Sequence, residues 1–210
     1  AKYKSRLVGG IGNIGTFSFY GNKIITTGEG GMITTNDEKI SSRIKYLRDH
    51  AMDQNKRYWH TEIGYNYRMT NLQAAIGVAQ LSRIDEIINK KINLLKYYKE
   101  KVNSSLEFHP QKKFAESVPW LICVVISESS NLNRGLFLDK LRENGIDTRP
   151  FFIPIHLMPP YSKYRLVHIQ DNSKDLICNN LSQMGFNLPS STKLKFSDLD
   201  YIADVINKNS

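Results

Sequence analysis

The stretch TFSFYGNK at residues 16–23, followed by TGEGG at residues 27–31, decides the fold of this chain. Aromatic side chains on either side of Ser18 predict a buried strand. That strand delivers one lysine, Lys23, into a glycine-rich turn. An amine held beside an apolar strand loses its charge more readily and can attack a carbonyl carbon to form a Schiff base. Lys23 is therefore a candidate nucleophile, although a lone lysine after a strand is more often a solvated surface residue.

The composition predicts a soluble, globular protein. Hydrophobic residues make up 40% and charged residues 23% of the 210 residues, a balance that excludes a disordered chain. This length allows one large domain or two small ones. No apolar run approaches the roughly 18 residues of a membrane-spanning helix. The segment that begins at Ala1 lacks the apolar core of a signal peptide.

The cysteines and the charge distribution exclude several kinds of site and partner. Cys123 and Cys178 are too few and too far apart for a CxxC zinc site or a disulfide framework, so we predict no bound metal. Two reduced thiols are typical of a cytoplasmic protein, the location that we predict. The net charge is +9, but the 29 lysines and arginines are interleaved with acids and form no aromatic-rich basic cluster. A positive field suits an anionic small substrate equally well, so we predict no nucleic-acid and no membrane partner.

Residues 1–67 are predicted to contain two strands, a helix and a loop. The strands are expected at 17–20 and 32–35, on either side of the glycine-rich turn. Asn36 or Asp37 can cap a helix that runs to about residue 50, because a short side-chain oxygen accepts from the first N–H groups of a helix. A polar, aromatic loop follows at 52–67. The buried face of the helix is expected to consist of Ile40, Ile44 and Leu47.

The strongest helical periodicity of the chain begins after Thr70 or Asn71. This helix is expected to continue, with a bend or a break, to about residue 102. Its length suggests an element that connects two domains, so we predict one domain at 1–85 and a smaller one at 86–210. The apolar stripe consists of Leu72, Ile76, Leu81, Ile84, Ile88, Ile92 and Leu95.

The remaining chain alternates strands and helices. We expect a buried strand at 119–127, a helix at 134–144 that Gly145 ends, a second strand at 146–153 and a terminal helix at 199–206. This order fits a small α/β or α+β domain.

Residues 10–15, GIGNIG, match the GxGxxG dinucleotide-binding pattern literally. That site needs a strand before the glycines and a helix after them, so that a pyrophosphate meets the helix N-terminus. Here residues 16–20 are strand-like, and no helix is expected before about residue 37. We therefore interpret these glycines as part of a turn. A P-loop is excluded because no GK[ST] closes the pattern.

Several spaced motifs, in the same order and across nearly the whole chain, resemble the DegT/DnrJ/EryC1/StrS aminotransferases. These are pyridoxal-phosphate enzymes of fold type I. The resemblance implies an α/β, aspartate-aminotransferase-like fold, in which 1–85 form part of the cofactor-binding large domain and 86–210 the small domain. The motifs are GTFSFYGNK at 15–23, TGEGGM at 27–32, LRDH at 47–50, GYNYRM at 64–69, QAAI at 73–76, GIDTRP at 145–150 and GFNLP at 185–189.

The resemblance assigns roles to individual residues. Lys23 would form the Schiff base with pyridoxal 5′-phosphate and then shuttle a proton. Ser18 would contact the cofactor phosphate, and Asn66 would reach the phosphate of the neighbouring subunit, which implies a homodimer with shared sites. Without the resemblance, Ser18 could equally point outward from a strand, and Asn66 would belong to an ordinary turn. Substrate contacts are suggested for Tyr65, Arg149 and His156.

Two of these substrate residues have competing interpretations. A histidine beside a proline-rich loop, such as His156, is often structural. Arg149 could bind a carboxylate or a phosphate, or simply pair with a surface acid.

The implied reaction moves an amino group, with glutamate as the expected donor, to a nucleotide-linked 4-keto-6-deoxy sugar for O-antigen (lipopolysaccharide) or other surface-glycan synthesis. Residues 149–161 resemble perosamine-synthase-like members, which favours amination at C4 over C3. Family members are nearly twice as long, and the carboxylate that pairs with the pyridinium nitrogen precedes the matching region. We therefore expect a C-terminal portion of such an enzyme, with little activity alone. The alternative is a catalytically inactive relative with a binding or regulatory role.

Overall fold

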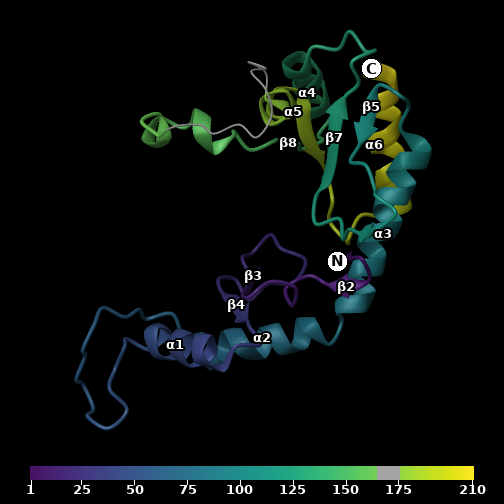
Figure 1. Ribbon diagram of the computed structural model, residues 1–210. Coiled ribbons are helices and arrows are strands. Elements are labelled where there is room, and N and C mark those ends of the chain that lie inside the picture. The colour runs from purple at the N-terminus through teal and green to yellow at the C-terminus, as the bar shows by residue number, and fades with distance from the viewer. Residues whose placement is uncertain (165–175) are drawn as a thin grey trace. The chain divides into compact units, whose positions relative to one another are not determined.

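This computed structural model describes residues 1–164 and 176–210 of the chain (Figure 1). Contacts divide the chain into two compact units. The first consists of Ala1–Asn89 and Gln111–Val118, and the second of Lys90–Pro110 and Pro119–Ser210. The domain boundary predicted after residue 85 stays a prediction for the protein's domains.

The strands of the first unit form two small sheets. Strands β3 (Gly15–Ser18) and β4 (Gly31–Thr34) pair antiparallel, with Ser18 opposite Gly31. The two predicted strands therefore exist, each displaced by one or two residues toward the N-terminus. The predicted burial of the first strand is wrong for this chain, because no residue of β3 is buried and Phe17 is 42% exposed. The second sheet has the order β2 (Arg6–Leu7), β1 (Lys2–Tyr3) and β6 (Ala115–Glu116).

Residues 9–13 form turns rather than a dinucleotide-binding site. Gly9 has a φ of +95°, and the Thr34 hydroxyl donates to its carbonyl at 2.6 Å. A Cβ on Gly15 would lie 2.1 Å from the same carbonyl oxygen, so only glycine fits there. Strand β3 follows directly, which confirms the interpretation of GIGNIG as a turn.

Helix α1 (Glu38–Arg48) begins at Asp37, whose carboxylate accepts from the N–H groups of Lys39 and Ile40 at 2.8 and 3.1 Å. This confirms one of the two predicted caps. The predicted burial of Ile40, Ile44 and Leu47 is wrong for this chain, because no residue of α1 is buried and these three are half-exposed. Periodicity identifies the apolar face, but the described residues cover that face only in part.

Helix α2 (Asn71–Leu81) begins at Thr70, one of the two predicted caps, and Thr70 forms a capping box with Gln73. The predicted break follows at Ser82, and α3 (Ile84–Lys101) continues the chain. The apolar stripe is covered unevenly. Leu72 of α2 is 80% exposed, whereas Leu95 of α3 is half-buried and packs against the core.

The second unit is built on an antiparallel sheet with the order β5 (Leu106–Phe108), β7 (Ile122–Ile126), β9 (Gly185–Leu188) and β8 (Arg149–Pro150). The strand expected at 119–127 is β7. The strand expected at 146–153 shortens to Arg149–Pro150, and the N–H of Phe151 adds one further hydrogen bond, to the Gly185 carbonyl at 3.2 Å. Strands β5 and β9 have no counterpart in the prediction.

Helices α4 (Arg134–Glu143), α5 (Ile177–Met184) and α6 (Phe196–Asn209) complete this unit, with two short 3₁₀ turns, η1 (Ile155–Leu157) and η2 (Pro159–Tyr161). Gly145, with a φ of +72°, follows α4 as predicted. The core contains side chains of α3, α4, α6 and the two central strands. Its largest fully buried members are Tyr98, Phe137, Phe186, Ile122, Ile126, Leu141, Ile206 and Val124.

Within the described residues, no helix is long and apolar enough to cross a membrane, and no group of three or more His, Cys, Asp or Glu side chains could hold a metal ion. Cys123 and Cys178 are both free thiols.

One lysine is enclosed in the second unit. Lys91 of α3 is 9% exposed, and its Nζ donates to the carbonyls of Trp120 and Ser190. Burial lowers the pKa of Lys91 from its ordinary value of 10.5, because the charged amine is taken out of water. Between the folded-state pKa and 10.5, the unfolded chain binds more protons than the folded chain, so stability rises with pH.

We predict that replacing Leu141, which is fully buried, with alanine costs about 2–5 kcal/mol of unfolding free energy through the cavity it leaves. Leu136→Ala on the same helix is the matched control, because Leu136 is 66% exposed, and it should cost less than about 0.5 kcal/mol. Urea unfolding measures both. Equal losses would contradict the assigned core.

We also predict that the unfolding free energy of the unsubstituted protein rises, relative to Lys91→Met, as pH increases toward 10.5. Urea unfolding should be followed below pH 10.0, the ordinary pKa of tyrosine, because burial raises the pKa of Tyr98 and opposes the trend above that value. The exposed Lys96 on α3 supplies the control, and Lys96→Met should keep the pH trend. If the unfolding free energies of Lys91→Met and of the unsubstituted protein depend on pH in the same way, the pH trend does not come from Lys91.

Candidate active site

The candidate nucleophile lies in a closed loop of residues 19–30, the lysine loop, which joins β3 to β4. The N–H of Phe19 donates to the Gly30 carbonyl at 2.9 Å, and the N–H of Thr27 donates back to the Phe19 carbonyl at 3.0 Å. Within the loop, the N–H of Lys23 donates to the Tyr20 carbonyl at 3.0 Å. The backbone of Lys23 therefore belongs to a tight turn that directly extends the hairpin.

Two glutamines of α2 anchor the lysine loop. The Gln80 carboxamide oxygen accepts from the N–H of Thr26 at 2.9 Å, and the Gln73 amide nitrogen donates to the Glu29 carbonyl at 3.2 Å. A buried or half-buried backbone group without a partner is costly, so each glutamine favours one position of the loop. Gln73 belongs to the QAAI motif that the sequence analysis quotes, but the anchoring role of both glutamines was missed because it depends on long-range contacts.

Glycines enclose Thr27 between the lysine loop and α2. Gly30 has a φ of +145°, and a Cβ there would lie 2.7 Å from the Thr27 hydroxyl. A Cβ on Gly77 would lie 3.1 Å from the Thr27 methyl group, so no larger side chain fits without a shift. Thr27 is only 4% exposed and donates to the Glu29 carbonyl at 2.7 Å. The glycines thus hold the loop that carries Lys23 close to α2.

Ser18 and Lys23 lie on one continuous segment. Ser18 ends β3 and is exposed, and its hydroxyl accepts from the N–H of Tyr20 over a long 3.4 Å. Lys23 is half-buried. The segment therefore presents an accessible hydroxyl and a primary amine five residues apart, which are the groups that a phosphate and an aldehyde require.

Asn66 and Tyr65 lie in the loop between α1 and α2, which Figure 1 shows extending away from β3 and β4. Asn66 pairs with Asp49 in an isolated bridge, and the N–H of His50 donates to the Tyr65 carbonyl at 2.9 Å. The Tyr65 ring stacks on Tyr67 with centroids 5.1 Å apart. This chain thus places Asn66 and Tyr65 together, next to the end of α1.

An ion pair that the sequence analysis missed supports Asn66. Arg68 Nε lies 3.1 Å from Asp49 Oδ1, next to the bridge between Asp49 and Asn66. The N–H of Tyr67 also donates to the Arg48 carbonyl at 3.0 Å. The backbone on both sides of Asn66 is therefore bound to the end of α1.

Arg149 and His156 belong to the second unit. Arg149 is exposed in β8, and its carbonyl accepts from the Asn187 amide at 3.2 Å. His156 is half-buried on η1, with its Nε2 3.0 Å from the Asn179 carboxamide oxygen. Both positions are compatible with substrate contacts, which remain predictions.

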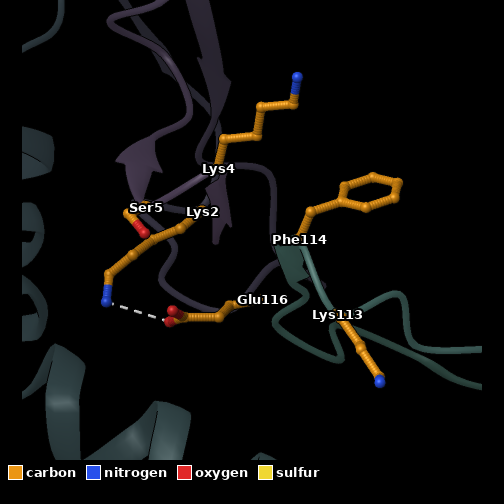
Figure 2. A pocket seen from close by; sticks show the side chains of 6 residues that line it. All are labelled: Lys2, Lys4, Ser5, Lys113, Phe114 and Glu116. Atoms are coloured by element: carbon orange, nitrogen blue, oxygen red, sulfur yellow. Dashed lines mark ion pairs between the residues drawn. The ribbon is translucent and has the colours of Figure 1, made fainter.

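A small pocket of about 60 Å³ beside the three-stranded sheet contains none of the predicted site residues. In Figure 2, Lys2 reaches Glu116, with 3.0 Å between Nζ and Oε2. Lys4 and Lys113 point away from each other, so the lysines do not converge on one point that could bind a phosphate. The pocket is lined by Lys2, Lys4, Ser5, Lys113, Phe114 and Glu116.

Known proteins similar to this chain share both its sequence pattern and its fold. GDP-perosamine synthase of Escherichia coli O157:H7 is 41% identical over 99% of this chain and 55% of its own length. EpsN of Bacillus subtilis, a putative pyridoxal phosphate-dependent aminotransferase, is 31% identical over 97% of this chain and 52% of its own length. This chain spans about half the length of the curated relatives it matches.

The solved structure of Helicobacter pylori PseC, an aminotransferase involved in the biosynthesis of pseudoaminic acid, matches with a TM-score of 0.86 at 26% identity, over 99% of this chain and 56% of that one. This similarity confirms the predicted fold type I. The sequence model of a pyridoxal-phosphate-dependent family matches residues 1–207. The chain therefore belongs to the DegT/DnrJ/EryC1/StrS aminotransferase family.

Proposed function

We propose that the protein containing this chain is a pyridoxal-phosphate-dependent aminotransferase that transfers an amino group from glutamate to a nucleotide-linked 4-keto-6-deoxy sugar. The observation that carries this proposal is the anchored lysine loop, with Lys23 on a turn that directly follows β3. The family match across residues 1–207 supports the same proposal.

The residues of the lysine loop fit the cofactor. Lys23 supplies a primary amine for an aldehyde, and Ser18 supplies an exposed hydroxyl for a phosphate. Gly28 is exposed, and a Cβ there would have no heavy atom within 4 Å, so the backbone lies open to a ligand. When bound, pyridoxal phosphate supplies an electron sink that weakens the bonds at the donor Cα.

Lys23 has two roles in the proposed reaction. Its Nζ would hold the cofactor at the aldehyde carbon, with loss of water, until the amine of the donor amino acid takes its place. The freed Nζ takes the proton from the donor Cα and delivers it to the cofactor C4′. In the second half-reaction, Lys23 moves protons in the opposite direction while the amino group passes to the sugar carbon.

The other predicted site residues bind and orient the cofactor and the substrate. Ser18 holds the phosphate, and Asn66 contacts the phosphate of the neighbouring subunit in a homodimer. Tyr65, Arg149 and His156 contact the sugar nucleotide. Positive charge on the chain, +9 overall, favours an anionic nucleotide sugar as substrate. We also propose a cytoplasmic location, which the two free thiols support.

The identity of the sugar is proposed from similarity. A GDP-perosamine synthase is 41% identical to the chain, which supports amination at C4 and a place in surface-glycan or O-antigen synthesis. The second candidate function is a binding or regulatory role of a catalytically inactive relative. The chain spans only 55% of the length of the GDP-perosamine synthase, which is the observation behind this candidate. Cofactor binding without turnover by the full-length protein would favour this second candidate.

We predict that Lys23→Ala in the full-length protein abolishes the absorbance band of the lysine-linked cofactor and lowers keto-sugar amination by at least roughly 10²–10⁴-fold, because it removes the group that moves the proton. Spectrophotometry and product analysis measure the two effects. Lys39→Ala, at an exposed lysine in the first turn of α1, is the control and should keep both. Undiminished amination by Lys23→Ala would show that Lys23 is not the catalytic lysine.

We also predict that Gln80→Ala weakens cofactor binding several-fold, because it leaves the N–H of Thr26 without its acceptor at roughly 1 kcal/mol. Titration with pyridoxal phosphate measures the dissociation constant. Gln80→Glu retains an acceptor oxygen and should restore most of the affinity. If Gln80→Glu and Gln80→Ala weaken cofactor binding equally, the hydrogen bond to Thr26 is not what anchors the lysine loop.

A further inference from the structure

A direct side-chain hydrogen bond joins His156 to a residue that the proposed reaction does not yet use. The Nε2 atom of His156 lies 3.0 Å from the carboxamide oxygen of Asn179. The two residues are 23 positions apart, and both are half-buried in the second unit. The contact joins η1 to α5.

The backbone that carries His156 is restrained. The N–H of Leu157 donates to the Pro154 carbonyl and the N–H of Met158 to the Ile155 carbonyl, each at 3.0 Å. Proline at 154 also has a fixed φ, which limits the conformations available to the turn. The position of the imidazole therefore depends mainly on its own side-chain torsions, and a hydrogen bond can select one orientation.

Asn179 is held just as firmly. The N–H of Asn179 donates to the Leu176 carbonyl at 2.8 Å in the first turn of α5. The far end of the same helix is bound to α4, because Arg134 Nη1 donates to the carbonyls of Ser182 and Gly185 at 2.7 and 3.3 Å. The carboxamide of Asn179 is thus presented from a helix with fixed ends.

The chemistry of the contact determines the imidazole tautomer. A carboxamide oxygen only accepts hydrogen bonds, so Nε2 must carry the hydrogen. The Cys178 thiol also donates to this oxygen, over 3.9 Å, which fits its role as an acceptor. In a neutral imidazole the other nitrogen, Nδ1, then carries a lone pair. Within residues 1–164 and 176–210, Nδ1 receives no hydrogen bond.

We propose that Asn179 is a positioning residue that holds His156 in the Nε2–H tautomer, so that Nδ1 accepts a hydrogen bond from a hydroxyl of the sugar substrate. The proposal rests on the proposed function for the identity of the substrate, whereas the tautomer follows from the contact alone. A histidine of the opposite tautomer would present an N–H instead and would favour an acceptor such as a phosphate or a carbonyl oxygen. Asn179 therefore selects which kind of substrate group His156 recognises.

The tautomer is tested by NMR of the full-length protein labelled with ¹⁵N-histidine. The chain has five histidines, and the signals of His156 are identified by their loss in His156→Gln. We expect Nε2 to be protonated and Nδ1 to be unprotonated in the unsubstituted protein and in Asn179→Asp, which keeps an acceptor oxygen. Asn179→Leu, of similar size but without an acceptor, should show a mixture of tautomers. A protonated Nδ1 in the unsubstituted protein, or an unchanged tautomer in Asn179→Leu, would overturn the proposal.

The consequence for the substrate is tested by separating the two half-reactions. Asn179→Leu should raise KM for the keto sugar nucleotide by about 5- to 20-fold, the effect of one hydrogen bond, while the spectral change on adding the amino donor keeps its rate. Asn179→Asp should restore most of the KM, and Asn180→Leu, at the exposed neighbour on α5, should leave KM unchanged. An equal slowing of both half-reactions, or an unchanged KM, would refute the positioning role. A donor reaction absent from the unsubstituted protein would refute the proposed function instead and leave the NMR result standing.

Discussion

The hydrogen bond from the N–H of Thr26 to the Gln80 carboxamide is the constraint on which the candidate active site depends. Thr27 is the one buried residue of the lysine loop, so the loop is not ordered by an apolar core of its own. Glycines let it lie against α2, where Thr27 is enclosed and Gln73 fixes the second contact. These contacts add to the hydrogen bonds at the end of the β3–β4 hairpin, which lead into the turn that carries Lys23.

The two units achieve their order by different means. Among residues 1–89, only Thr27 and Ala51 are buried, so backbone and side-chain hydrogen bonds, an ion pair and glycine contacts define the first unit. The second unit has a contiguous apolar core between its antiparallel sheet and three helices. Hydrogen bonds therefore position Lys23 and Asn66, whereas a packed core supports the elements that carry Arg149 and His156.

The sequence predicts those features that local physics determines. The caps at Asp37 and Thr70 follow from short-range hydrogen-bonding patterns, and both are present, as is a break between α2 and α3. The burial of α1 could not be predicted, because it depends on what covers the helix rather than on its periodicity. The same limit applies to the site. Lys23 is visible from its motif, but the anchoring glutamines and Asn179 emerge only when residues far apart in the sequence meet.

The central claim is that Lys23 is the residue that binds pyridoxal phosphate covalently. Borohydride reduction of the full-length protein with pyridoxal phosphate would make that bond permanent, and peptide mass spectrometry would then locate it. The account predicts one modified residue, Lys23, and competition by the amino donor when it is added before the reductant. Modification of another lysine with Lys23 intact, or no modification at all, would contradict the account.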